Sequence, residues 1–437
     1  MTWKTMEYAG WGRALKAEGR IARPERASAL KRLCADSPAP AIGNRRSYGD
    51  APLNSDGDAI DMTRMDRIID FDADAGLLQV EAGCTISNLA QLFAPLGWLP
   101  PVMPGTGFAT VGGCIAMDVH GKNHHHAGSF GQHVTALTLL QGETRKTVTP
   151  ERQGTLFKAT VGGLGQTGVI EKATIQMLPC KGDVMVVTER RVENLDEHLA
   201  VLDASDATYS VGWVDATAMG DALGRGIVEE GETGGGLVPK RKGAKSVPFD
   251  APAFALSPRV VRNFNAAYFR RVPPSGRTVV KPITDFFFPL DRIHDWNRLY
   301  GKTGFHQFQC VLPLSETAVL REMLEVIGRA GIASPLAVLK RMGPGRAGFM
   351  SFPMEGYTLA VDFPNRGHAI DLVIRLQDMT ADAGGRIYLA KDALARGGDV
   401  RAMYPEWHDW RVVAEKSDPE GNLTTDLVRR LDLRSAP

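Results

Sequence analysis

Cysteine is scarce in this 437-residue chain, and the five that occur form no recognisable pattern. They are odd in number, widely spaced and never arranged as C-x-x-C: Cys34, Cys84, Cys114, Cys180 and Cys310. A disulfide framework needs paired cysteines, and a zinc site needs closely spaced ligands. The sequence therefore predicts reduced thiols and a cytoplasmic protein.

Charge of one sign and long apolar runs are also missing. The 51 basic and 50 acidic residues leave a net charge of +1, whereas a nucleic-acid partner requires a strongly basic face. No run of 18 apolar residues occurs, and the first twenty residues contain no apolar core of a signal peptide. We expect no transmembrane helix, no secretory signal and no nucleic-acid partner.

Glycine, in contrast, is plentiful and gathers in three places: Gly43–Asp50, Pro104–Gly131 and Val161–Gly168. Neither G-x-G-x-x-G after a first strand nor G-x-x-x-x-G-K-[ST] is present, which excludes the Rossmann and P-loop interpretations. Glycine-rich turns allow close approach of the backbone to a ligand. Three of them between strand-like runs predict loops that converge on one large phosphate-bearing cofactor.

The second of these stretches holds seven glycines and four histidines. Thr110 to Gly113 predicts the start of a short helix, whose first N–H groups we expect to be free to bind a pyrophosphate. Polar residues follow at Asp118, His120, Lys122 and Asn123. Consecutive histidines cannot all face one ion, and no carboxylate or cysteine joins them at a familiar spacing, so we expect no metal.

The order of motifs resembles a known family. The motifs are RSYGD (46–50), VMPGT (102–106), VGG (111–113), DVHGKNHH (118–125), AGSFG (127–131), ATVGGLGQTG (159–168), VDFP (361–364) and AKD (390–392). In this order they resemble the flavoprotein oxidase superfamily related to vanillyl-alcohol oxidase, and within it the decaprenylphosphoryl-β-D-ribose 2′-oxidase family. The resemblance runs through nearly the whole chain, and it implies FAD as the cofactor.

The fold class that follows is α+β, in two domains, as expected at this length. The resemblance implies an FAD-binding domain over 1–182, a substrate domain over 183–385 and a C-terminal segment, 386–437, that returns to the FAD-binding domain. In the second unit the sequence predicts strands at 185–192, 209–214, 284–288, 308–312, 336–341 and 357–363, and helices at 316–330 and 367–383. This order lacks a βαβ rhythm and favours an antiparallel sheet with helices on one face.

Five residues are candidates for catalysis. The resemblance makes Lys391 in the AKD motif the positive group beside the flavin or a contact of the substrate hydroxyl, and Lys340 a second active-site lysine that pairs with phosphate. His120 is assigned to orient or deprotonate the hydroxyl. Gln309 and Tyr48 are expected to line the same cavity.

The candidate cofactor-binding residues combine the turns with the resemblance: Gly43, Asn44, Arg45, Arg46, Ser47, Tyr48, Pro104, Gly105, Thr106, Thr110, Val111, Gly112, Gly113, Met117, Asp118, His120, Gly121, Asn123, Gly128, Gly168, Val169, Ile170 and Lys391. Many relatives hold FAD covalently through a histidine in the first turn, where this chain has Arg46. We therefore expect FAD to be bound non-covalently.

Three further positions depart from the family pattern. Ala360 stands where mycobacterial members carry a cysteine beside the flavin. Phe287 stands where an aromatic hydroxyl is common, and Thr358 replaces an asparagine. These changes concern the sugar more than the type of reaction.

The function implied is oxidation of the 2′-hydroxyl of a polyprenyl-phosphoryl-β-D-ribose to the keto sugar, the first half of an epimerisation to arabinose. A short-chain-dehydrogenase-type reductase would complete it. An oxidase of a soluble sugar, alditol or aldonolactone is the first alternative, and a non-catalytic flavin-binding scaffold or electron carrier is the second. A lipid-linked substrate also implies peripheral contact with the inner face of the membrane. The stretch 231–252 predicts a mobile loop, with Lys240, Arg241, Lys242 and Lys245 either solvated or facing anionic lipid or the substrate phosphate.

Overall fold

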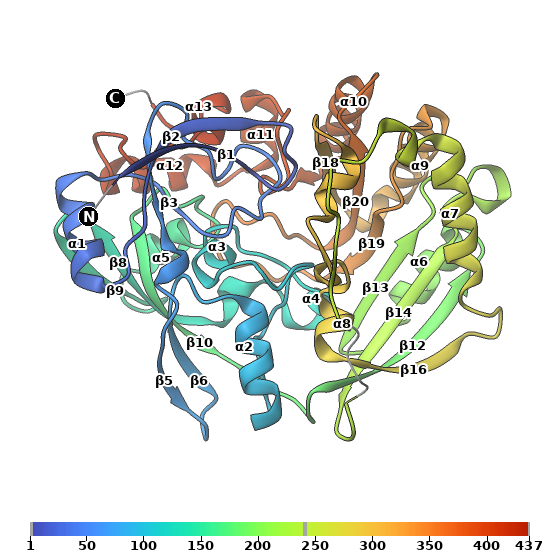
Figure 1. The fold of residues 1–437 in the computed structure, drawn as a ribbon, viewed down its shortest axis with the longest axis horizontal. Helices are drawn as coiled ribbons and strands as arrows, with labels where there is room; N and C mark the ends of the chain where they lie inside the picture. Colours follow the sequence, from blue (N-terminus) through green and yellow to red (C-terminus); the bar gives the residue numbers. More distant parts are fainter. Residues whose placement is uncertain (1–2, 239–242, 436–437) are drawn as a thin grey trace.

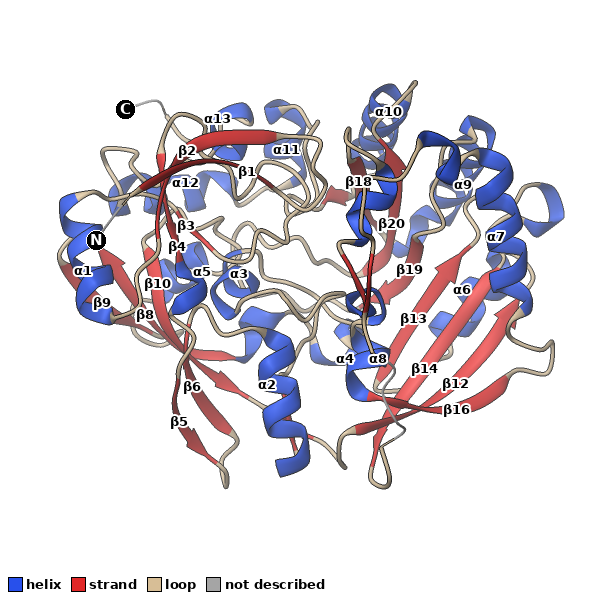
Figure 2. Cartoon of the chain, viewed as in Figure 1, coloured by secondary structure: helices blue, strands red, loops and turns tan. Residues whose placement is uncertain are grey.

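The structure is a computed structural model that describes residues 3–238 and 243–435. Figure 1 shows two halves side by side, one built mainly from the first 180 residues and one built on a single large sheet. Figure 2 shows that loops fill most of the region between them. No described helix is both long and apolar enough to cross a bilayer.

The first half contains two larger sheets and the short antiparallel pair β7 (Trp98–Leu99) and β11 (Leu178–Pro179). A four-stranded sheet has the order β1 (Lys4–Ala9), β2 (Lys16–Ala22), β4 (Asp58–Asp61) and β3 (Ala41–Ile42). An antiparallel five-stranded sheet has the order β5 (Ile68–Asp72), β6 (Leu77–Glu81), β10 (Val169–Gln176), β8 (Val134–Gln141) and β9 (Thr144–Val148). The helices are α1 (Ala27–Asp36), α2 (Ile86–Phe93), α3 (Val111–Ala116), α4 (His124–Ala127) and α5 (Gly154–Thr160).

Periodic burial explains the elements of this half. Leu78 and Val80 alternate along β6 and are fully buried, as a half-buried strand requires. In α2 the buried residues are Ile86, Leu89, Ala90 and Phe93, whereas Leu92 is 54% exposed. Leu92 follows Ile86 by six residues, which places it about 120° round the helix from that residue and therefore away from the core.

The second half is an eight-stranded antiparallel sheet. Its order is β16 (Arg277–Pro282), β12 (Val184–Val192), β14 (Gly226–Gly234), β13 (Tyr209–Val214), β19 (Ala337–Met342), β20 (Gly356–Pro364), β18 (Phe305–Leu312) and β21 (Arg386–Ile387). The antiparallel arrangement is confirmed. The strand predicted at 284–288 is wrong, because Ile283–Phe287 forms helix α8. Its three consecutive phenylalanines are all buried, and such an unbroken apolar run does not distinguish a strand from a helix.

The two faces of this sheet carry different helices. α6 (Leu195–Asp203), α9 (Thr317–Ala330) and α10 (Ala369–Asp382) pack on the face where His198 meets Gly212. α7 (Pro258–Arg270) and α8 lie on the opposite face, where Trp213 packs on Tyr268 with ring centroids 4.7 Å apart. That second face also borders the first half of the molecule.

The last fifty residues lie against the first half (Figure 1). They contain α11 (Gly397–Met403), α12 (Trp407–Ser417) and α13 (Asp426–Arg430). α12 packs on α5, and the side-chain amide of Gln166 donates to the carbonyl of Leu423 at 2.7 Å. The boundaries at residues 182 and 385 stay predictions.

The expected mobile loop at 231–252 is wrong at its start. β14 continues to Gly234, pairing with β12 over its whole length. Lys245 belongs to the short strand β15 (Lys245–Ser246), which pairs with β17 (Ile293–His294). Lys240, Arg241 and Lys242 lie outside the described residues.

Candidate active site

A cavity of about 730 Å³ lies between the two halves. Its size falls in the range of sites that enclose a small molecule or cofactor. The first half contributes the turn from Gly43 to Tyr48 and the stretch from Met103 to Lys122. The second half contributes strands β13, β14, β18, β19 and β20, and the loop that carries Lys391 completes the wall.

The first glycine turn is joined directly to the AKD motif. The N–H of Tyr48 donates to the carbonyl of Ala390 at 2.9 Å. A Cβ on Gly49 would lie 1.6 Å from the carbonyl oxygen of Asp392, so only glycine allows this approach. Arg430 binds the carboxylates of both Asp50 and Asp392, at 2.6 and 2.8 Å. Two motifs 340 residues apart in sequence thus form one rigid wall.

Lys391 projects from this wall over the ring of Tyr48, with its Nζ 3.4 Å from the ring centroid. Burial lowers the pKa of Lys391, and the nearby carboxylate of Asp362 partly opposes that shift. Asp362 is fully buried and accepts hydrogen bonds from Gln307 Nε2 at 2.5 Å and from the Tyr300 hydroxyl at 3.1 Å. Burial in turn raises the pKa of Asp362, and Lys391 opposes that shift. Lys391 therefore sits between an aromatic face and a buried carboxyl group, and each of the two groups favours the charged form of the other.

His120 lies between side chains from two strands of the sheet. Its Nδ1 is 3.0 Å from Lys340 Nζ, and its Nε2 is 2.9 Å from Gln309 Nε2. Burial and the neighbouring Lys340 hold the pKa of His120 well below its ordinary value, so the ring is neutral at pH 7. A neutral imidazole has one donor and one acceptor nitrogen.

Two proton arrangements satisfy these contacts. When Lys340 is an ammonium it donates to Nδ1, the ring proton lies on Nε2, and the Gln309 amide turns its oxygen toward it. When Lys340 is neutral it accepts from Nδ1–H, and Nε2 is an acceptor. Burial lowers the pKa of Lys340 to about 7, with Lys122 and Lys391 contributing further, so the two forms interconvert near neutral pH.

A third lysine enters the cavity from the glycine-rich stretch. Lys122 donates to the carbonyl of Phe286 at 2.6 Å and lies 3.9 Å from the centroid of that ring. Burial lowers the pKa of Lys122 to about 8. Three lysines with lowered pKa in one cavity mark a functional site and favour an anionic ligand.

Backbone donors line the other end of the cavity. Within the described residues, the N–H groups of Asn44, Arg45, Arg46 and Ser47 donate to no other group of the chain. Arg45 has φ of 51°, in the left-handed region, and successive N–H groups in such a turn form a concave anion site. These four residues are half-buried, and their N–H groups are free to bind a ligand in the cavity. This row of donors, together with the cavity's size, fits the phosphates of a dinucleotide such as FAD.

The expectation that the first N–H groups of the short helix are free to bind a pyrophosphate is wrong. α3 begins where predicted, with Thr110 as its N-cap. However, the N–H groups of Val111 and Gly112 donate to the carbonyls of Cys84 and Ala82, both at 2.8 Å, and that of Gly113 donates to the Thr110 hydroxyl at 3.3 Å. The first two donors hold the helix to the turn after β6, and the third closes the helix's own cap, so none of the three is available to an anion.

The structure separates the predicted cofactor residues into two sets. Fifteen line the cavity: Gly43, Asn44, Arg45, Arg46, Ser47, Tyr48, Pro104, Gly105, Thr106, Thr110, Gly113, Met117, His120, Gly121 and Lys391. Eight do not: Val111, Gly112, Asp118, Asn123, Gly128, Gly168, Val169 and Ile170. The predicted catalytic residues Lys340 and Gln309 also line it.

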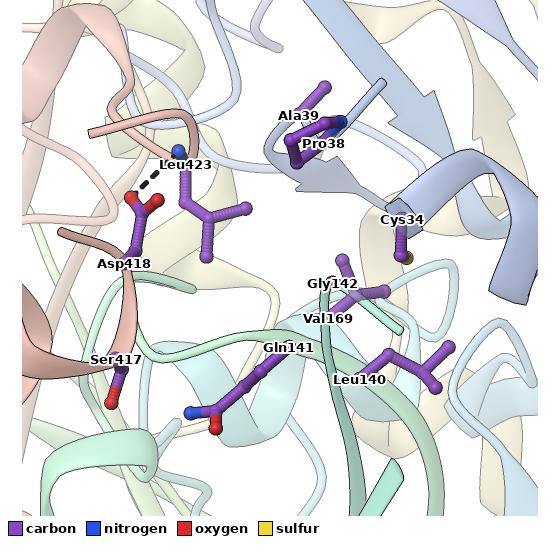
Figure 3. A pocket seen from close by; sticks show the side chains of 10 residues that line it. All are labelled: Cys34, Pro38, Ala39, Leu140, Gln141, Gly142, Val169, Ser417, Asp418 and Leu423. Carbon is purple, nitrogen blue, oxygen red and sulfur yellow. Dashed lines mark hydrogen bonds between the residues drawn. The ribbon is translucent and has the colours of Figure 1, made fainter. Parts of the chain in front are cut away.

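Residues of the second set have other contacts. Asp118 is fully buried and accepts from the Ser351 hydroxyl at 2.5 Å and the Gly131 N–H at 2.8 Å, which ties its loop to the second half. Val169 lines a separate pocket of about 40 Å³ with Cys34 and Asp418 (Figure 3). The third glycine turn therefore reaches the large cavity only at Leu164 and Gly165.

Sequence reasoning missed several side chains of the cavity. Gln307 lies two residues before Gln309 on β18, so strand alternation places both amides on one face. Asp362, which is fully buried and acts on the charge of Lys391, was visible only as part of the VDFP motif. Arg271 and Lys281 come from α7's end and β16, an element that the sequence did not predict.

The positions that depart from the family pattern all face the cavity: Arg46, Phe287, Thr358 and Ala360. Arg46 has its guanidinium 4.0 Å from the ring centroid of Trp11 and 4.6 Å from that of Phe108. A guanidinium is not a nucleophile, so this position offers no covalent link to a cofactor. The histidines next to His120 have structural contacts, such as His125 with the carbonyl of Ala207 at 2.9 Å. Among the described residues no group of three or more His, Cys, Asp or Glu side chains could hold a metal ion.

Comparison with known proteins agrees with this geometry. Residues 20–149 match a family model described as an FAD binding domain. The chain is 38% identical over 408 residues to the decaprenylphosphoryl-β-D-ribose oxidase of Mycolicibacterium smegmatis, covering 90% of this chain and 89% of that protein. The chain belongs to the decaprenylphosphoryl-β-D-ribose oxidase family. The α+β flavoprotein fold and the cofactor FAD, both expected from the motifs, are confirmed.

Two further relatives are similar over most of the chain, at lower identity. An uncharacterised protein of Streptomyces coelicolor is 33% identical over 80% of this chain and 100% of its own length. The L-gulono-1,4-lactone dehydrogenase of Mycobacterium tuberculosis is 21% identical over 90% of this chain and 89% of its own. The match to the FAD-binding family model and the similarity to the oxidase of Mycolicibacterium smegmatis identify the chain as an FAD-dependent oxidoreductase acting on CH–OH donors.

Proposed function

We propose that the chain oxidises the 2′-hydroxyl of a polyprenyl-phosphoryl-β-D-ribose to the 2′-keto sugar. The observation that carries this proposal is the placement of Lys391, His120 and Lys340 in one cavity whose other end offers backbone donors suited to FAD. Bound FAD supplies the hydride acceptor for the carbinol carbon. The protein must then supply a proton acceptor, a positive charge and a site for the phosphate.

The proton acceptor is the pair of His120 and Lys340. With Lys340 neutral, Nδ1–H of His120 donates to Lys340 Nζ, and Nε2 is ready to accept the hydroxyl proton. As Nε2 gains that proton, Nδ1 passes its own to Lys340, which becomes an ammonium. Because Gln309 contacts Nε2 in the structure, the substrate hydroxyl replaces its amide there. The contact between Lys340 Nζ and His120 Nδ1 favours a role for Lys340 in proton relay over direct pairing with the phosphate.

Lys391 supplies the positive charge that a reduced flavin or a developing alkoxide requires. Its neighbours Tyr48 and Asp362 fix its position and favour its charged form. Before the substrate binds, Gln309 holds the His120 ring in place, and Tyr48 supports Lys391 from the first glycine turn. The substrate phosphate meets Lys122, the third lysine of the cavity whose pKa burial lowers.

The remaining parts of the proposal follow from the product and the substrate. A 2′-keto sugar becomes the arabinose epimer only after reduction, so a keto-sugar reductase of the short-chain-dehydrogenase type must act next. A polyprenyl chain resides in a bilayer, so the protein must meet a membrane surface. FAD is held non-covalently, because Arg46 stands where a covalent histidine would be, and acid precipitation should therefore release the flavin.

The test is anaerobic titration of the FAD-loaded protein, followed by the visible flavin band. Short-chain polyprenyl-phosphoryl ribose should bleach the band, whereas free ribose, alditols and aldonolactones should not. Bleaching by a soluble sugar with no dependence on phosphate would overturn the lipid substrate and leave the reaction type standing. A band that no sugar bleaches would overturn the reaction type as well.

A further inference from the structure

Exposed aromatic rings are confined to one short stretch of this protein. Phe249, Phe254 and Phe264 are 67%, 72% and 51% exposed. No other phenylalanine, tryptophan or tyrosine in residues 3–238 and 243–435 is exposed. Exposed Val260, Ile293 and Leu299 lie in adjoining elements, and we call these six residues the aromatic patch. A grouped set of exposed apolar side chains of this kind marks an interaction site.

The rings are exposed although the backbone beneath them is held in place. Arg366 donates to the carbonyls of Ala253 and Leu256, in and at the end of the 3-10 helix η5 (Ala253–Leu256). Arg13 pairs with Asp250 at 2.6 Å across the gap between the two halves. The chain around Phe249 and Phe254 is thus fixed to the body of the protein, with the rings turned outward.

The same stretch also presents basic side chains at the surface. Residues 243–302 hold ten basic and four acidic residues, of which Arg271, Arg277 and Lys281 are paired with glutamates of the large sheet. Arg259 and Arg262 are exposed on α7, the helix that also presents Val260 and Phe264. An amphipathic surface with phenylalanines and basic side chains matches the chemistry of an anionic lipid bilayer.

This surface adjoins the cavity. Phe264 stacks on Tyr268 with ring centroids 5.9 Å apart, and Tyr268 lines the cavity. Leu290, Arg292 and Trp296, from the same basic stretch, line it too. In Figure 1, α7 lies beside the large sheet at the right of the view, and its Tyr268 packs on Trp213 of β13, which also lines the cavity. A bilayer that contacts the aromatic patch would therefore lie close to the cavity.

We infer that the aromatic patch and the arginines of α7 dock this protein on the surface of an anionic membrane and bring the cavity to the lipid-linked substrate. This inference rests on the proposed function for its purpose. Docking itself depends only on the exposed rings and the charge, so the two are tested separately.

The experiment is flotation of the FAD-loaded full chain with vesicles of phosphatidylcholine alone or with about 30% phosphatidylglycerol. The protein should float with the anionic vesicles and dissociate as salt is raised. Phe249→Ser/Phe254→Ser/Phe264→Ser should weaken binding at least about tenfold. Arg259→Gln/Arg262→Gln should weaken it about fivefold for each charge removed.

The matched control is Leu92→Ser/Leu96→Ser, which removes two side chains, 54% and 63% exposed, from the first half of the molecule. It should bind vesicles like the wild type. Equal loss in this control, unchanged binding of the triple variant, or no binding by the wild type at low salt would overturn the inference. If light scattering shows that the wild type is a dimer and the triple variant a monomer, the patch binds a second copy of the chain, and the inference is overturned too.

Activity on a short-chain, water-soluble substrate separates the two proposals. The triple variant should bleach its flavin with that substrate at the wild-type rate, because none of the three rings lines the cavity. If the wild type floats with vesicles but is never bleached, the proposed function fails and the docking surface stands.

Discussion

The two ends of the cavity are built from different parts of the chain. One end consists of backbone: the donors of Asn44 to Ser47, and turns in which a glycine lies against another loop. The other end consists of side chains on adjacent strands, with Lys340, Gln309 and Thr358 on β19, β18 and β20. The difference teaches that the first end depends on the absence of Cβ atoms, whereas the second depends on charge and proton position.

The largest effect should come from adding a single methyl group where two loops meet at the backbone end. In Gly49→Ala the new Cβ would meet the Asp392 carbonyl, so the first turn and the AKD wall must separate. We expect a loss of about 3 kcal/mol in the free energy of unfolding, the upper end for overpacking, together with loss of FAD. Thermal unfolding and the ratio of flavin to protein absorbance measure both.

Gly154→Ala is the matched control, because no described atom lies within 4 Å of where its Cβ would be. It should retain FAD and unfold like the wild type. If Gly49→Ala also retains FAD and stability, the two motifs do not form one rigid wall.

The next effect concerns proton position at the side-chain end. Since kcat/KM reports the free enzyme, it should rise with pH through about 7, as Lys340 loses its proton and His120 Nε2 becomes an acceptor. Lys340→Met should lower kcat/KM by about 100-fold at the pH optimum of the wild type, within the range for general-base catalysis, and remove this rising limb. Exposed Lys158→Met should change neither. A rising limb that survives in Lys340→Met would contradict the relay.

The smallest effect sharpens the account of Lys391. Activity requires its cation, so kcat/KM should fall again at higher pH as Lys391 loses its proton. The Asp362 carboxylate raises the pKa of Lys391, and Asp362→Asn should therefore move the falling limb to lower pH. We expect about a tenfold decrease at the optimum, typical of a lost charge contact in a buried site. A falling limb that stays in place would show that Asp362 does not act through Lys391.

The backbone end could be predicted from sequence because dense groups of glycine indicate turns in which the backbone approaches a ligand or another loop closely. Gly43 to Ser47 and Gly105 were found this way, and they line the cavity. The helix start at Thr110 was also found, but not the partners of its N–H groups. Those partners, Ala82 and Cys84, follow another strand, and no local pattern reveals which carbonyl a donor will meet.

The side-chain end was predictable only in part. The resemblance indicated Lys391, Lys340 and His120, but no spacing along the chain shows that Lys340 and His120 touch across 220 residues. Gln307 could have been found by alternation from Gln309. Arg271 and Lys281 could not, since neither α7 nor β16 was predicted. Strand 284–288 was misjudged because a fully buried apolar run has no period.

The most direct test of the account is the rate of flavin bleaching in Lys391→Ala, measured anaerobically by stopped flow with short-chain polyprenyl-phosphoryl ribose. The backbone end is intact in this variant, so FAD should remain bound and its spectrum should be normal. The rate should fall about 1000-fold, the size expected when a group that stabilises developing charge is removed. Bleaching at the wild-type rate would contradict the division of the cavity into a backbone end that holds the cofactor and a side-chain end that performs the oxidation.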